Sequence, residues 1–229
     1  MIINRVIPIK FEIDNTTTTY SWWTHYNVWE TYVFTVMDRY LTRKQNFIDV
    51  GAWNGAVSLY ASNLCKNVYA FEPDPVAYED LIKNKGINEY TNIHAFEVAI
   101  SDKNSTSYIY TTNTFGNSCS TLKERDTEKI EVQTNTFENV IDLYDISNVG
   151  LIKMDIEGWE DVVLPNMLDY LSINKTPIHL SLHWHLFDVQ KMIGVLMELS
   201  KIYTIENAWS QITTVESIIN EKHGELLLF

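Results

Sequence analysis

Cysteine and long apolar runs are the features that this sequence of 229 residues has least of. Cys65 and Cys119 are its only cysteines, too few for a disulfide framework or a zinc site, and we expect free thiols in a reducing compartment. No stretch approaches the roughly 20 consecutive apolar residues of a membrane span, and the first residues hold no long apolar segment of a secretory leader. We therefore expect a cytoplasmic protein without a membrane-spanning segment.

Positive charge is scarce as well. Lysine and arginine together number 17 against 30 aspartates and glutamates, which gives a formal net charge of -13. Such a field repels the phosphates of nucleic acids and an anionic membrane surface, and the basic side chains form no run. Nucleic acids and membranes are therefore not expected as partners, and the oligomeric state stays open.

From residue 47 onward, the chain alternates short apolar runs with helical segments. The expected strands span residues 47–51, 68–72, 93–98, 151–154, 178–184, 202–205 and 226–229, and the expected helices include 56–64, 75–85 and 189–200. Strands that alternate with helices form a mainly parallel sheet that is covered on both faces. Because 45% of the residues are hydrophobic, the chain is expected to form an α/β fold with a packed core.

Residues 1–46 come before this alternation and hold many large aromatic side chains. These are Tyr20, Trp22, Trp23, Tyr26, Trp29 and Tyr32. An amphipathic helix is predicted by the interleaved apolar residues Val28, Val33, Phe34 and Val36. The aromatic residues either pack this helix onto the sheet or form a lid that stacks on a bound sugar. We divide the chain into this helical and aromatic extension, residues 1–46, and a cofactor-binding domain, residues 47–229.

A second irregular region, residues 101–136, is rich in serine, threonine and asparagine. We expect it to form a β-hairpin with a long loop around residues 112–127. Long loops inside a compact domain are often functional, so this loop is a candidate part of the site.

A glycine-containing turn follows the first expected strand. Gly51 and Gly55 permit a tight turn and a close approach of the backbone to a ligand, and the next helix offers free N–H groups. Glu72 ends the second strand 21 residues after Gly51, where a carboxylate accepts hydrogen bonds from ribose hydroxyls. Trp53 stands where a dinucleotide fingerprint has its middle glycine, which leaves little room for a pyrophosphate. The turn therefore favours an adenosine cofactor without phosphate, such as S-adenosylmethionine, over NAD or FAD.

A pair of carboxylates, Asp155 and Glu157, comes directly after the expected strand at 151–154. In an extended backbone, residues two apart point to the same side, and ligands of open α/β sheets bind beyond the carboxyl ends of the strands. The pair therefore predicts a polar site. Glu160 and Asp161 are interpreted instead as acids at the start of the next helix, where the helix dipole favours them.

Taken in order, these motifs resemble the FkbM-type methyltransferase family. The resemblance rests on segments 47–55, 68–75 and 151–158, with 98–102 between the last two, and it covers residues 45–185. It implies a Rossmann-like class I methyltransferase fold, with a mainly parallel seven-stranded sheet whose last strand is antiparallel. It also implies O-methylation by S-adenosylmethionine, with S-adenosylhomocysteine as product. Sugar hydroxyls of glycans or natural products are frequent acceptors in the family, so a small-molecule or glycan acceptor is the expected partner.

The resemblance also implies cofactor-binding residues by their position in the motifs. Asp49, Gly51 and Gly55 are assigned to the methionine end, Glu72 to the ribose, Ala99 and Asp102 to the adenine edge, and Ala52, Asn54 and Asp155 to the rest of the site. Trp53 and Asn54 replace a pair that is usually small or aliphatic in the family. Residues 1–46 and 111–127 match no part of the family, so the identity of the acceptor stays open.

Methyl transfer to a hydroxyl needs a base or a metal, because an alcohol is a poor nucleophile unless its proton is removed. Period-2 geometry in the expected strand 178–184 and its extension puts four residues on one face, His179, Ser181, His183 and His185. His179 is interpreted as an interior histidine. His183 and His185, at the carboxyl end beside Asp155, are with Asp155 the catalytic candidates.

Two mechanisms remain open for these residues. In the first, His183 is the general base, and Asp155 orients it or the acceptor. In the second, Asp155, Glu157 and His183 bind Mg²⁺ or another divalent ion, which lowers the pKa of the acceptor hydroxyl.

Two other functions are weighed against methyl transfer. A NAD-dependent oxidoreductase would also bind a nucleotide at the first turn, but its fingerprint requires a glycine at the position of Trp53. A non-enzymatic carbohydrate-binding module would explain the aromatic residues and the acidic charge, but not the segments 49–72 and 153–157.

Overall fold

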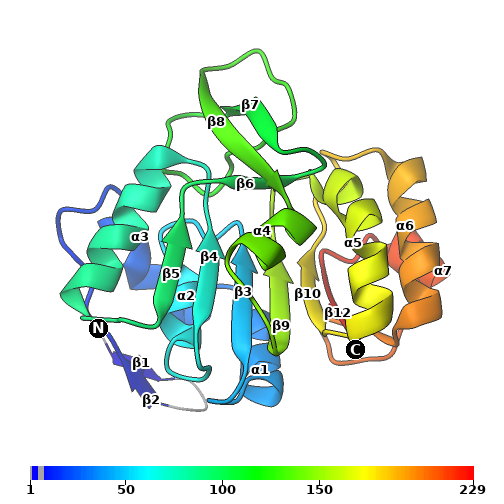
Figure 1. The fold of residues 1–229 in the computed structure, drawn as a ribbon, viewed down its shortest axis with the longest axis horizontal. Helices are drawn as coiled ribbons and strands as arrows, with labels where there is room; N and C mark the ends of the chain where they lie inside the picture. The colour runs from blue at the N-terminus through cyan, green and yellow to red at the C-terminus, as the bar shows by residue number, and fades with distance from the viewer. Residues whose placement is uncertain (1, 5–7) are drawn as a thin grey trace.

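A computed structural model describes residues 2–4 and 8–229 of the chain, with side chains from residue 9 onward. A central sheet forms the middle layer of the molecule (Figure 1). In chain order its strands are β3 (Asn46–Val50), β4 (Val68–Phe71), β5 (Ile93–Phe96), β9 (Val149–Met154), β10 (Ile178–Ser181), β11 (Ile205–Asn207) and β12 (Glu225–Leu228). Across the sheet they lie in the order β11-β12-β10-β9-β3-β4-β5. Only β12 is antiparallel to its neighbours, so the mainly parallel sheet with an antiparallel last strand is confirmed.

Helices cover both faces of this sheet because its strands carry apolar side chains on both faces. Phe47 of β3 belongs to one apolar core, and its neighbour Ile48 belongs to the other, as the alternation of side chains along a strand requires. The helices on the Phe47 face are α1 (Thr31–Tyr40), α2 (Ala56–Ala61) and α3 (Pro75–Ile87). Those on the Ile48 face are α4 (Phe137–Leu143), α5 (Glu160–Asn174), α6 (Val189–Ile202) and α7 (Val215–Glu221).

The starts of α3 and α6 are set by side chains next to them in the sequence. Asp74 Oδ1 accepts hydrogen bonds from the backbone N–H groups of Val76 and Ala77 at 2.9 and 3.3 Å, and Pro75 takes the first helical position. Asp188 caps α6 in the same way. These carboxylates satisfy N–H groups that the first turn of a helix leaves free.

Two expected strands have different bounds in the structure. β10 stops at Ser181, because the chain turns after it and the N–H of Leu186 donates to the carbonyl of His183 at 2.7 Å. The period-2 argument that placed His183 and His185 on a strand face is therefore wrong, since both residues lie in this turn. Ile202 still belongs to α6, and β11 begins at Ile205.

A second, smaller sheet lies at the top of Figure 1, beyond the carboxyl ends of the central strands. β7 (Ser105–Tyr110) and β8 (Lys129–Thr136) form the predicted antiparallel hairpin, and β6 (Ala99–Ser101) pairs in parallel with β8. The loop between β7 and β8 folds back toward the central sheet. Its Gly116 carbonyl accepts a hydrogen bond from the indole N–H of Trp53 at 2.8 Å.

The N-terminal segment packs onto the sheet face that carries α1 and α2. β1 (Ile2–Asn4) and β2 (Pro8–Lys10) form a hairpin, and the 3₁₀ helix η1 (Tyr20–Val28) precedes α1. Trp23 and Tyr26 of η1 are buried in the apolar core of that face. The predicted amphipathic helix is α1, whose Val33, Phe34 and Val36 are buried, whereas Val28 lies outside it. None of the helices in the described part of the chain combines the length and apolar character that crossing a membrane requires.

Candidate active site

A cavity of about 310 Å³ opens at the carboxyl ends of the central strands. The residues that follow β3, β4, β9 and β10 line it, together with the start of β12 and parts of the small sheet and its loop. In open α/β sheets this edge is where ligands bind, because the strand order reverses there and leaves a crevice. The site was predicted at this edge, and the cavity lies there.

The turn after β3 has a backbone that its neighbours force on it. Gly51 has a φ of +79°, and a Cβ at this position would lie 1.9 Å from the carbonyl oxygen of Asp155. Trp53 also adopts a left-handed φ of +49°, which is uncommon for a bulky residue. Its backbone N–H donates to Glu72 Oε2 at 2.7 Å. The hydrogen bond from the indole to the Gly116 carbonyl fixes the side chain of the same residue. Trp53 therefore joins the turn to the loop after β7.

Glu72 therefore holds the turn as well as facing the cavity. Its Oε1 accepts a hydrogen bond from the N–H of Asp74 at 2.8 Å, and its side chain is almost fully buried. Burial raises the pKa of Glu72 to about 8, because its effect exceeds that of the hydrogen bonds from Asp74 and Trp53, which lower the pKa.

The predicted cofactor-binding residues fall into two groups. Those that line the cavity are Gly51, Ala52, Glu72, Ala99 and Asp155. Asp49, Asn54, Gly55 and Asp102 are not part of its lining.

Two residues of the second group lie buried beneath the turn. Asp49 accepts a hydrogen bond from Ser58 Oγ at 2.7 Å, and Asn54 Nδ2 donates to Thr19 Oγ1 at 2.9 Å. These contacts hold the turn in place from below.

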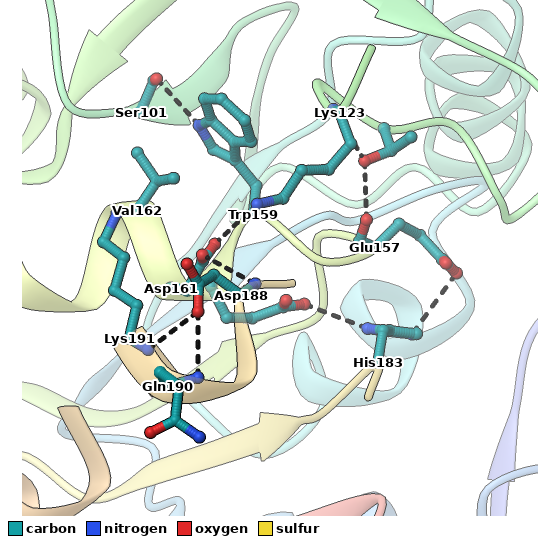
Figure 2. A network of polar contacts seen from close by, with 12 residues as sticks. Ser101, Lys123, Glu157, Trp159, Asp161, Val162, His183, Asp188, Gln190 and Lys191 are labelled. Carbon is teal, nitrogen blue, oxygen red and sulfur yellow. Dashed lines mark hydrogen bonds and ion pairs between the residues drawn. The ribbon is translucent and has the colours of Figure 1, made fainter. Parts of the chain in front are cut away.

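Apolar residues that sequence reasoning missed line the cavity near Ala99. Ile100 follows it in β6, Ile109 comes from β7, Leu122 from the loop and Trp159 from the segment before α5. The Trp159 indole N–H donates to Ser101 Oγ at 3.0 Å, which ties this segment to β6 (Figure 2). Segment 98–102 and the loop around residues 112–127 were expected at the site, but these four side chains were not, because their meeting depends on how the small sheet docks.

Lys153 is a buried cation beneath the cavity that the sequence analysis left without a role. Its Nζ donates to the carbonyl of Gly51 at 2.7 Å and lies 3.5 Å from Asp49 Oδ1 and 3.6 Å from Asp155 Oδ2. Burial alone would lower the pKa of Lys153, but the charges of Asp155 and Asp49 outweigh it and raise the pKa. A lysine inside the apolar run 151–154 was the available signal.

His183 is surrounded by three carboxylates. Its Nδ1 lies 3.1 Å from Glu160 Oε1, and its Nε2 lies 3.5 Å from both Asp155 Oδ1 and Glu157 Oε1 (Figure 2 shows the contact with Glu157). Burial would lower the pKa of His183, but the hydrogen bond with Glu160 and the charges of Asp155, Glu160 and Glu157 raise it to about 9. His185, the other predicted histidine, is exposed and does not line the cavity.

The roles expected for two acids need revision. Glu160 does begin α5, but it is fully buried and contacts His183, so the helix dipole alone does not explain it. Glu157 has a φ of +52°, so the segment after β9 is not extended as the two-residue spacing assumed. Its carboxylate still reaches His183, because the loop bends back toward the turn after β10.

Asp155, Glu157 and His183 each offer one atom that can bind a metal, and these atoms lie within 4.8 Å of one another. The donor set holds an imidazole nitrogen. Mg²⁺ prefers oxygen ligands, whereas imidazole suits ions such as Zn²⁺ or Fe²⁺. Of the divalent ions considered for the metal-assisted mechanism, the residues therefore fit a transition-metal ion better than Mg²⁺.

Glu30 is another residue of the site that sequence reasoning missed. It stands just before α1 with a φ of +36° and lines the cavity, and its Oε2 is buried without a hydrogen-bond partner among the described residues. Burial, followed by the charge of Asp155, raises the pKa of Glu30 to about 8. Glu30 is the only acid between Asp14 and Asp38, in a segment otherwise dominated by aromatic residues, which was the available signal.

The sheet order, the antiparallel β12 and the cavity over the ends of β3 and β4 define a Rossmann-like class I methyltransferase fold. The sequence matches the Methyltransferase FkbM domain over residues 49–222, and the chain belongs to this methyltransferase family. The resemblance to FkbM-type methyltransferases drawn from the motifs is thereby confirmed.

Solved structures similar to this chain are distant in sequence. Methyltransferase FkbM from Methylobacillus flagellatus KT is 17% identical with a TM-score of 0.51, over 82% of this chain and 44% of that one. An rRNA methylase from Streptococcus thermophilus is 11% identical with a TM-score of 0.49, over 86% and 93% of the two chains. Aeropyrum pernix fibrillarin, in complex with natively bound S-adenosyl-L-methionine, is 10% identical with a TM-score of 0.46, over 82% and 67%. The chain thus spans less than half the length of the Methylobacillus structure. A search of curated proteins finds no match.

Proposed function

We propose that this chain is an S-adenosylmethionine-dependent O-methyltransferase that modifies a sugar hydroxyl of a glycan or glycosylated natural product. The observation that carries the proposal is the single cavity that joins the Gly51 turn and Glu72 to a basic histidine, His183. The Gly51 turn and Glu72 suit the binding of an adenosine cofactor, and His183 suits the removal of a proton from a hydroxyl acceptor.

The cofactor would lie along the ends of β3, β4 and β6. Glu72 is positioned to accept hydrogen bonds from the ribose hydroxyls, and the glycine turn leaves space for the methionine part. The apolar side chains of Ile100, Ile109 and Leu122 suit the adenine. Trp53 fills the place where a pyrophosphate would have to approach the turn, which disfavours the alternative of a NAD-dependent oxidoreductase.

His183 is the proposed general base. S-adenosylmethionine supplies a methyl group on a sulfonium, and transfer to a hydroxyl oxygen leaves S-adenosylhomocysteine and a proton. His183 Nε2 faces the cavity end with Asp155 and Glu157, and it would accept that proton while the carboxylates stabilise the imidazolium. Glu160 holds the other ring nitrogen and so orients the ring.

A metal-assisted reaction is the second candidate for the same residues. Asp155, Glu157 and His183 would hold the ion, and the ion would lower the pKa of the acceptor hydroxyl. Treatment with EDTA separates the candidates. Turnover that survives chelation excludes the metal-assisted mechanism. Turnover that is lost and then restored by Zn²⁺ or Mn²⁺ excludes the metal-free mechanism.

Thermal denaturation with candidate ligands tests the proposed cofactor. Only a ligand that binds the folded protein raises the melting temperature, and we expect S-adenosylhomocysteine to raise it and NADH to leave it unchanged. A shift with NADH alone would favour the oxidoreductase. Binding of sugars without any adenosine compound would favour the carbohydrate-binding module.

A further inference from the structure

The cavity has an acidic end that the proposed reaction does not use. Ser181 ends β10 and is the antiparallel partner of Glu225, the first residue of β12, and both line the cavity. Glu30 lines it from the segment before α1. The three residues come from distant parts of the chain and meet at the side of His183.

The cations at this end already have carboxylate partners. Lys153 lies between Asp49 and Asp155. His183 contacts Asp155, Glu157 and Glu160. The carboxyl groups of Glu30 and Glu225 form no ion pair or hydrogen bond with any described side chain, so two acidic groups line the cavity without a direct partner.

Burial makes these unpaired carboxylates costly. Desolvation, and then the charge of Asp155, raises the pKa of Glu225 to about 7, and the same two causes act on Glu30. Glu30 Oε2 is fully shielded and has no hydrogen-bond donor among the residues described. A buried acceptor without a donor is destabilising, and a ligand supplies the donor once the Glu30 side chain turns this oxygen toward the cavity.

Ser181 gives an independent sign of a ligand at the same place. It is 7% exposed, lines the cavity, and its hydroxyl makes no hydrogen bond within the described part of the chain. Buried hydroxyls are normally paired. Beside these polar groups, Trp29 lines the cavity next to Glu30.

We propose that the acidic end binds an ammonium group of the acceptor between Glu30 and Glu225, with the Ser181 hydroxyl as a further acceptor, so that the acceptor is an amine-bearing sugar. This inference rests on the proposed O-methyltransferase function. An ammonium donates three hydrogen bonds, and its positive charge pairs with the acidic groups of Glu30 and Glu225. A neutral sugar would satisfy the hydroxyl but would not favour the ionised form of either carboxyl group, as an ammonium does.

The cofactor itself carries an α-ammonium, which is the other source of the same chemistry. The charges that act on Glu30 are those of Asp155, Lys153, Glu225 and His183, on the side of the proposed base. Glu72, at the proposed ribose position, is not among them. His183, the proposed base for the acceptor, is among these charges, but so is Asp155 at the cofactor side, so binding of the cofactor product with and without its α-amino group decides between the two sources.

Calorimetry on the protein saturated with S-adenosylhomocysteine tests the proposal. The probes are glucose, N-acetylglucosamine and glucoses that carry an amine at carbon 2, 3, 4 or 6. We expect at least one aminoglucose to bind at least about tenfold tighter than glucose, because a hydrogen-bonded charge pair adds to the binding energy. We expect Glu225→Gln and Glu30→Gln each to remove this preference. Glu216→Gln, the same change at an exposed position on α7, should keep it.

The outcomes are distinct. Equal affinity for amine and hydroxyl sugars, or no sugar binding at all, overturns the amine assignment. If the two cavity variants weaken S-adenosylhomocysteine but not its analogue without the α-amino group, the ammonium belongs to the cofactor and the assignment is again overturned. Failure of the wild-type protein to bind S-adenosylhomocysteine in the first titration refutes the proposed function itself, before any sugar is added.

Discussion

At the scale of single residues, His183 decides how the acceptor loses its proton. Its pKa of about 9 makes it a stronger base than an ordinary imidazole, but most of it is protonated at neutral pH. Each pH unit below that value lowers the unprotonated, active fraction about tenfold. The rate of the metal-free reaction should therefore rise with pH until about pH 9 and then level off.

Replacing His183 tests this role. We expect His183→Gln to lower kcat by about 10²–10⁴-fold and to abolish the rise of kcat with pH, because general bases contribute that much. Binding of S-adenosylhomocysteine should stay near the wild-type value. A variant with full activity, or with an unchanged pH profile, would contradict the assignment of the base.

Glu160 offers a subtler test, since it acts through His183. Glu160→Gln keeps a group that can accept from Nδ1 but removes the charge that raises the pKa of His183. The rise of kcat should shift to lower pH, with a smaller plateau because the weaker base drives the transfer less. If the plateau of kcat falls but the rise of kcat stays at the same pH, Glu160 only supports the fold.

Much of the site could be predicted from the sequence at this scale, and the reason is geometric. Gly51, Glu72 and Asp155 each follow a strand directly, and the carboxyl ends of parallel strands meet at one edge. Glu30 and Glu225 could not be found in this way. Glu30 precedes a helix outside the family motifs, and Glu225 begins the antiparallel strand, whose amino end is at this edge.

At the scale of elements, the turn between β3 and α2 depends on a glycine. A Cβ on Gly51 would collide with the carbonyl oxygen of Asp155, and its φ of +79° is unfavourable for any other L-residue. We expect Gly51→Ala to lower the free energy of unfolding by more than about 2 kcal/mol, measured by urea denaturation.

Gly194 in α6 provides the matched control. A Cβ there meets no atom within 4 Å, and alanine is the better helix former by roughly 1 kcal/mol. Gly194→Ala should therefore be neutral or stabilising. Equal effects of the two substitutions would show that the turn tolerates a side chain and that its close packing against Asp155 is not required.

The strands and the hairpin were predictable because their apolar patterns are local. The end of β10 was not, since residues 182–184 continue an apolar pattern that would suit a strand and only the turn at His183 ends it. β6 was missed because its three residues pair with β8, which is far away in the sequence. Local pattern identifies an element, whereas tertiary pairing sets where it stops.

At the scale of the whole molecule, several buried acidic groups around the cavity make the stability depend on pH. Burial raises the pKa of four carboxyl groups around the cavity, to about 8 for Glu30 and Glu72 and about 7 for Glu157 and Glu225. The folded protein thus binds more protons than the unfolded chain between pH 4.5 and these values. His183 acts in the same direction from its ordinary pKa of 6.5 up to about 9. The free energy of unfolding must then fall as pH rises through this window.

The ligand-free protein should therefore have a lower Tm at about pH 8.5 than at about pH 6.5. His179 opposes this decrease only near the lower limit, because its pKa is about 3 in the folded protein whereas its ordinary pKa of 6.5 leaves half of it protonated in the unfolded chain at that pH. A double variant with Glu30→Gln and Glu225→Gln should show a smaller decrease than Glu216→Gln. A Tm that rises with pH over this interval would mean that the cavity carboxyls are not buried as described.

The claim on which the rest depends is that the Gly51 turn and Glu72 hold an adenosine cofactor, and titration calorimetry with S-adenosylhomocysteine tests it most directly. We expect the wild-type protein to bind, and Glu97→Gln to bind like wild type. We expect Glu72→Gln to bind about tenfold more weakly, because the amide has one acceptor oxygen in place of the two that hold the turn and face the ribose position. Glu97 follows the neighbouring strand β5 but is exposed and outside the cavity lining. Glu97→Gln therefore makes the same chemical change outside the cavity. No binding by the wild-type protein, or equal binding by both variants, would contradict the proposed site.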